Sequence, residues 1–151
     1  TGDIVLADDS GLVVDHLGGE PGIYSARYMG EDTSYEIKNR NIIDRLKDAG
    51  GRSRSARFVC NIAAVLPDGR VLHTEETMEG MIAEEPAGSG GFGYDPILFL
   101  PEYGLTSAEI TMEEKNKISH RGKALRAMKA ALEKVLKKEM ERTQDENINC
   151  Q

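Results

Sequence analysis

The chain has 151 residues, which is enough for one domain with its own hydrophobic core but short for two ordinary domains. With 39% hydrophobic and 30% charged residues, its composition is that of a globular protein and excludes a disordered one. The formal net charge of −7 argues against binding to a nucleic acid polymer, because a polyanionic backbone requires a basic face.

The sequence carries no sign of export or of membrane insertion. Neither end shows a charged segment followed by an apolar one, and no apolar run is long enough to cross a bilayer. Cys60 lies in a strand-like run and Cys150 in a polar tail, so a disulfide framework or paired zinc motif is not expected. We therefore expect a cytoplasmic protein without a membrane partner.

The first part of the chain combines short apolar runs with glycine-rich loops. Residues 3–7 predict a buried strand that delivers Asp8 and Asp9 to its carboxyl end, and residues 12–14 predict another short strand. Residues 18–22 predict a loop, and a capping-box pattern at residues 33–36 predicts a helix that ends near residue 49. Because the chain opens without an initiator methionine and enters a strand at once, we expect it to be the later part of a longer protein.

The rest of the chain predicts a sheet followed by two helices. Residues 58–66 are apolar at almost every position, as in a central strand covered on both faces, and residues 71–83 and 97–99 predict further strands. A second capping box at residues 111–114 starts a short helix that breaks around Ser119. The last helix is expected to dock on the sheet and to fray after Glu141, which leaves residues 143–151 as a polar tail. Its docking stripe is formed by Leu125, Met128, Leu132, Val135 and Leu136.

The first motif with chemical potential is Asp8-Asp9-Ser10-Gly11. Carboxylates at a strand end can hold Mg²⁺, whose oxygen-rich shell usually includes substrate phosphates and water, and a carboxylate there can also deprotonate the water. Clusters of Asp, Ser and Gly are also common in turns, so the motif fits an acidic turn equally well.

The second motif runs from Gly88 to Pro96 and places two aromatic rings and a carboxylate among glycines. A purine can stack on Phe92 or Tyr94, which contributes about 1 to 3 kcal/mol, and Asp95 can accept hydrogen bonds from ring nitrogens that carry protons. The alternative is that both rings belong to the core and that Asp95 is a turn residue. No Gly-Lys-Ser/Thr follows the glycines, so the segment is not a Walker motif.

The third motif gathers cations and hydrogen-bond donors at the junction of the last two helices. Lys115, His120 and Arg121 lie at this junction, where the free backbone amides at the start of a helix also favour the binding of anions. Arg121 can donate two hydrogen bonds to the carbonyl and a ring nitrogen of a purine. The other basic residues nearby, including Arg126, fit a solvated helix end instead.

The order of these motifs closely resembles the non-canonical purine NTP pyrophosphatases, which are the inosine triphosphatase-like enzymes. The resemblance rests on residues 7–12, 17–28, 90–96 and 113–125 and covers the chain from Leu6 to the last helix. It implies an α/β fold over residues 1–142, with a mixed, twisted β-sheet flanked by helices and an active-site cleft between two lobes. It also implies a cytoplasmic homodimer that uses Mg²⁺ to hydrolyse ITP, dITP and XTP to the monophosphate and pyrophosphate, clearing them from the nucleotide pool.

The resemblance assigns roles to residues by position. Asp9 is implied to be the metal ligand and proton acceptor, with Asp8 as a second candidate ligand. His120 and Arg121 are implied to read the 6-oxo edge of the purine, so that the amino group of adenine meets donors instead of an acceptor. The residues implied to bind substrate are Ser10, Phe92, Gly93, Tyr94, Asp95, Lys115, His120 and Arg121.

One departure from the family pattern leaves two alternatives open. Family members begin with a Thr/Ser-Gly-Asn-x-x-Lys phosphate loop, a long helix and a metal-binding glutamate, and none of these precedes Leu6 here, so we expect an N-terminally truncated domain. The first alternative is a truncated, inactive member with a nucleotide-binding or structural role. The second is a signalling receiver domain, but a receiver requires a helix directly after its acidic pair, whereas residues 12–22 predict strand and loop.

Overall fold

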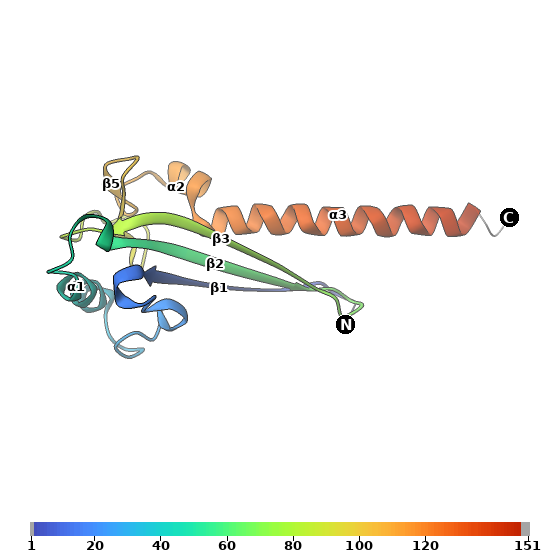
Figure 1. Cartoon of the computed structure of the whole chain (residues 1–151). Helices are drawn as coiled ribbons and strands as arrows, with labels where there is room; N and C mark the ends of the chain where they lie inside the picture. The colour runs from blue at the N-terminus through green and yellow to red at the C-terminus, as the bar shows by residue number, and fades with distance from the viewer. Residues whose placement is uncertain (1, 149–151) are drawn as a thin grey trace.

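The computed structural model describes residues 2–148, so Cys150 lies outside the described part. The strands are β1 (Val5–Val14), β2 (Ser55–Val65), β3 (Val71–Ile82), β4 (Leu98–Leu100) and β5 (Leu105–Thr106), and the α-helices are α1 (Tyr35–Arg45), α2 (Met112–Ile118) and α3 (His120–Ile148). The strands form one sheet in the order β1-β2-β3-β4-β5, packed with helices (Figure 1). The α/β class expected from the sequence is confirmed.

Within this class, the pairing of the described strands is antiparallel throughout, whereas a mixed sheet was expected. Tight turns explain part of the difference: β2 and β3, for example, are joined across Pro67-Asp68-Gly69. A turn this short can connect antiparallel neighbours but not parallel ones, which need a long crossover.

β1 is one continuous strand of ten residues, where two short strands separated by a turn were expected. Asp8 stands opposite Ile62 of β2, and Asp9 stands opposite Asn61. Pairing with a long neighbouring strand therefore outweighs the turn preference of Asp, Ser and Gly. As a result, both carboxylates lie in the middle of a strand and not at its carboxyl end.

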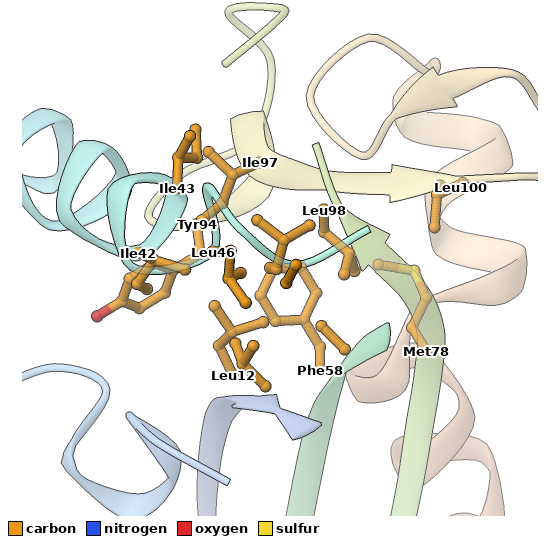
Figure 2. Close-up of a cluster of buried hydrophobic side chains, with 14 residues drawn as sticks. Leu12, Ile42, Ile43, Leu46, Phe58, Met78, Tyr94, Ile97, Leu98 and Leu100 are labelled. Carbon is orange, nitrogen blue, oxygen red and sulfur yellow. The ribbon is translucent and has the colours of Figure 1, made fainter. Parts of the chain in front are cut away.

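β2 is a central strand, but only one of its faces is fully buried. Buried residues alternate with partly exposed ones from Ala56 to Ala64, although both faces are apolar in sequence. A first group of buried side chains covers one end of this face and brings the strands against α1 and the segment around β4 (Figure 2). A second group covers the other end, where Cys60, Ile62 and Ala64 pack under Ala124 and Met128 of α3.

The helix ends follow local capping. The backbone N–H groups of Ile37 and Glu114 donate to the hydroxyls of Ser34 and Thr111 at 3.4 and 3.2 Å, which caps α1 and α2 as N-cap residues commonly do. α1 ends at Arg45, earlier than expected. In the segment that follows, the carbonyls of residues 46 and 49 accept hydrogen bonds from the buried guanidinium of Arg54.

α3 runs beside β2 and β3 and projects beyond their ends (Figure 1). The expectation that it frays after Glu141 is wrong for the described residues, because the helix continues to Ile148. No glycine or proline interrupts residues 123–148, and Arg142 and Glu146 form an i,i+4 ion pair at 3.7 Å. The docking face is also rotated from the predicted stripe, since Leu125 and Leu136 are 51% and 48% exposed. No helix within residues 2–148 is long and apolar enough to span a membrane.

Candidate functional site

A pocket of about 300 Å³ borders the first buried group, from which Leu12, Phe58 and Tyr94 line it, and this volume suits a small-molecule site. Its walls come from residues 10–12 of β1, from Phe58 of β2, from the loop at residues 91–95 and from the junction of α2 and α3. The pocket brings together all the residues predicted to bind substrate, although they belong to three motifs far apart in the sequence. These lining residues are Ser10, Phe92, Gly93, Tyr94, Asp95, Lys115, His120 and Arg121.

Asp9 does not belong to the lining of this pocket. Side chains alternate along a strand, so Asp9 shares with Asn61 the face of the sheet that α3 does not cover, and it is exposed there. Asp8 lies on the other face and accepts from the guanidinium of Arg121 at 3.0 Å. The two carboxylates therefore point apart, and residues 2–148 contain no group of three or more His, Cys, Asp or Glu side chains that could hold a metal.

Two buried polar atoms of the lining residues, Ser10 Oγ and His120 Nδ1, have no hydrogen-bond partner in the described part of the chain. Buried polar groups in native proteins are almost always hydrogen-bonded, so unpaired atoms in a pocket indicate a place for a ligand or water. Burial, helped by the positive charge of Arg121, lowers the pKa of His120 from 6.5 to about 4. The imidazole is therefore neutral near pH 7 and offers one donor and one acceptor.

The two rings of the glycine loop lie in different environments, whereas the sequence predicted either that both were open to a purine or that both belonged to the core. Phe92 is 73% exposed and Tyr94 only 5%. The hydroxyl of Tyr94 donates to the carbonyl of Ser25 at 2.6 Å, and its ring packs edge-on against Tyr35. Burial also raises the pKa of Tyr94, which stays protonated. Phe92 thus presents a free ring face at the pocket, whereas Tyr94 is a wall residue that belongs to the core.

Asp95 is buried, and both of its carboxylate oxygens are engaged. Oδ2 accepts from the backbone N–H of Phe92 at 2.8 Å and from the ammonium of Lys115 at 2.5 Å. Oδ1 accepts from the hydroxyl of Ser107 at 2.7 Å. The carboxylate therefore ties the loop to α2 and does not project freely toward a base, as the sequence had suggested.

The junction of α2 and α3 is built by a cap at Ser119, which confirms the helix break predicted there, and by contacts of Arg126 that the sequence did not reveal. The backbone N–H of Gly122 donates to the hydroxyl of Ser119 at 3.0 Å, which caps α3. Arg126, interpreted above as part of a solvated helix end, donates to the carbonyls of Asn116 and Lys117 at 3.1 and 2.9 Å and so caps α2. These contacts fix the turn from which His120 and Arg121 enter the pocket.

Other lining residues lie outside the set that the sequence predicted. Tyr35 and Met112 border the pocket, and Ser107 supports it from behind. In the sequence, Tyr35, Met112 and Ser107 are isolated residues that belong to no motif typical of a binding site. Only the fold, which brings α1, α2 and the segment after β5 to one place, reveals their position.

Comparison with known proteins gives consistent results. The model of the Ham1 family matches residues 1–131. The dITP/XTP pyrophosphatase of Clostridium perfringens is 49% identical over 134 residues, which are 89% of this chain and 66% of that protein. The enzyme of the same name from Thermus thermophilus is 52% identical over 128 residues, which are 85% of this chain and 61% of that protein.

Solved structures agree with this similarity. The structure of the Staphylococcus aureus Ham1 protein superposes with a TM-score of 0.81 at 43% identity and covers 87% of this chain and 68% of that one. A HAM1 protein from Coxiella burnetii also gives a TM-score of 0.81, at 40% identity, over 89% of this chain and 69% of that one. The chain spans slightly less than two thirds of the length of the two pyrophosphatases.

Proposed function

Because this chain belongs to the Ham1 family, we propose that it hydrolyses deaminated purine nucleoside triphosphates, such as ITP, dITP and XTP, to the monophosphate and pyrophosphate. The observation that carries the proposal is the pocket, whose lining combines the exposed ring of Phe92 with two residues, Ser10 and His120, that each hold a buried polar atom without a partner in the described part of the chain. A purine base has the size, the π-face and the polar edge that this combination suits.

Phe92 binds the base by stacking, and His120 and Arg121 read its 6-oxo edge. The guanidinium of Arg121 donates to the 6-oxo oxygen and to N7 of hypoxanthine or xanthine, both of which are acceptors. Adenine presents an amino group at this edge, and a donor facing a donor disfavours it. Ser10, at the β1 side of the pocket, contacts the sugar or the first phosphate, and Lys115 contributes positive charge.

We assign the metal to Asp9. Mg²⁺ usually takes one or two protein carboxylates and fills its remaining positions with water and substrate phosphates, so a single exposed carboxylate fits its needs. When bound, Mg²⁺ supplies charge neutralisation at the phosphates. Asp9 orients the attacking water and accepts its proton, while Asp8 holds Arg121 and is not a metal ligand. The homodimeric state and the cytoplasmic location implied by the family resemblance are part of this proposal.

The test is pyrophosphate release from ITP, XTP, GTP and ATP in the presence of Mg²⁺, with the C. perfringens relative as positive control. We expect pyrophosphate from ITP and XTP and little from ATP. Asp9→Asn should reduce turnover by at least about a hundredfold and leave the affinity for IMP within about twofold. Asp68→Asn, which removes an exposed carboxylate at the β2–β3 turn, is the matched control and should change neither. Full turnover in Asp9→Asn would exclude the assignment.

A second candidate function is nucleotide binding without turnover. The separation of Asp9 from the pocket favours it, because the base can bind without any contribution from this carboxylate. In that case IMP binds to the chain with a preference over AMP, but no pyrophosphate is released under conditions in which the C. perfringens relative is active.

A further inference from the structure

The loop that carries Phe92 is held from behind by the last residue of β5 and the segment that follows it. The hydroxyl of Thr106 donates to the carbonyl of Ala87 at 2.7 Å, and the backbone N–H of Gly90 donates to the carbonyl of Ala108 at 2.9 Å. Between these two backbone contacts lies Ser107, which is 1% exposed and whose hydroxyl donates to Asp95 Oδ1. Of the three contacts, this is the one that reaches a side chain of the pocket wall.

Asp95 links Ser107 to two residues that line the pocket. Its other oxygen, Oδ2, receives both the backbone N–H of Phe92 and the ammonium of Lys115. The ammonium also lies 5.5 Å from the centroid of the Phe92 ring, within the range of a cation–π contact. One carboxylate thus sets the relative position of the ring and the cation.

We propose that Ser107 is a positioning residue of the nucleotide site, which acts through Asp95 on Lys115 and Phe92. The hydroxyl fixes Oδ1, and this determines the rotation of the carboxylate and the direction in which Oδ2 points. Without it, a buried oxygen loses its partner, and the carboxylate turns to satisfy it at the expense of its contacts with Phe92 or Lys115. The identity of the ligand as a purine nucleotide rests on the proposed function, whereas the positioning itself does not.

Ser107→Ala tests this inference, with Thr106→Val as the matched control. Both changes remove a hydroxyl from adjacent, buried positions, 1% and 2% exposed, but that of Thr106 donates to a backbone carbonyl. Ser107→Ala should raise the KM for ITP about tenfold and leave kcat within about twofold, because the pocket is disturbed and Asp9 is not. Thr106→Val should leave KM within about twofold even if it lowers the melting temperature.

A double-mutant cycle with Lys115→Met separates positioning from general loosening of the loop. Because Ser107 acts partly through Lys115, Ser107→Ala should raise KM less in the Lys115→Met background than in the wild type. Additive effects, or an equal rise of KM in Thr106→Val, would overturn the inference. If Ser107→Ala does not fold, Ser107→Cys replaces it, because a thiol has a similar volume and is a weaker hydrogen-bond donor. The KM of Ser107→Cys should be higher than that of the wild type. An unchanged KM would overturn the inference.

A measurement without turnover keeps this result independent of the proposed function. In the NMR spectrum, Ser107→Ala should shift the amide proton of Phe92 and the ammonium signal of Lys115, and Thr106→Val should not. If these shifts occur in a chain that releases no pyrophosphate, the positioning stands and the proposed function fails. If they do not occur, the inference fails even in an active enzyme.

Discussion

At the scale of single residues, the protonation state of His120 decides what the pocket can bind. Its ring packs 5.0 Å from that of Phe58, and burial is the main cause of its low pKa. A charged imidazole would offer two donors, whereas the neutral ring keeps one nitrogen free to accept. The polar edge of the pocket is therefore defined by one cation, Arg121, and one neutral group.

This state predicts how stability depends on pH. The pKa of His120 is about 4 in the folded chain and near 6.5 when exposed, so the unfolded chain binds more protons between these values. The free energy of unfolding should therefore fall as the pH is lowered from 6.5 toward 4. His120→Gln should show a smaller fall over this window in urea titrations. Equal slopes in both proteins, or an NMR titration of His120 near 6.5, would contradict the prediction.

A second residue-scale prediction concerns Gly91. Its φ of +70° disfavours any side chain, and a Cβ there would lie 2.8 Å from Lys115 Nζ and even closer to Asp95. Gly91→Ala should abolish measurable IMP binding in calorimetry and cost more stability than the roughly 1 kcal/mol expected from φ alone. Gly18→Ala is the control, because Gly18 has a φ of +65° with no atom within 4 Å of its Cβ position. Equal losses in the two variants would show that crowding at the site is unimportant.

At the scale of elements, sequence predicts best where the relevant contact is local. Ser34, Thr111 and Ser119 mark helix ends because each cap is completed within three residues along the chain. The middle of β1 was misinterpreted because its partner, β2, is some fifty residues away and its pairing leaves no local signal. For the same reason the motifs predicted which side chains line the pocket but not the burial of Tyr94, which depends on the distant Ser25.

The junction of α2 and α3 gives an element-scale prediction. Replacing a glycine in a helix by alanine usually stabilises it by about 1 kcal/mol. At Gly122, however, the new Cβ would lie 2.6 Å from the carbonyl oxygen of Asn116 and 2.9 Å from Ser119 Oγ. Gly122→Ala should therefore lower the melting temperature and weaken IMP binding, because the turn that presents His120 moves. Gly50→Ala, with no atom within 4 Å of its Cβ position, is the control. A rise in stability of Gly122→Ala would refute this account of the junction.

At the scale of the whole molecule, the sheet separates the two parts of the proposed site. The base pocket lies on the face covered by the two buried groups, whereas Asp9 lies on the opposite face. β1 is the edge strand of the described sheet, and Ser10 lines the pocket next to Asp9 in sequence. In the proposed site, a nucleoside triphosphate with its base in the pocket leads its phosphates past Ser10 toward Asp9.

This division predicts that chelation of metal affects the two ends of the ligand differently. Removing Mg²⁺ with EDTA should abolish pyrophosphate release and weaken ITP binding, because the phosphates lose their counter-charge. The affinity for inosine, which has no phosphate, should stay within about twofold, since its binding depends on the pocket alone. Calorimetry of inosine and ITP with and without EDTA measures both effects. Phe92→Ala should lose affinity for inosine whether or not metal is present. If EDTA weakens inosine as much as ITP, the base and the metal share one site, and the separation across β1 does not describe how the protein binds its ligand.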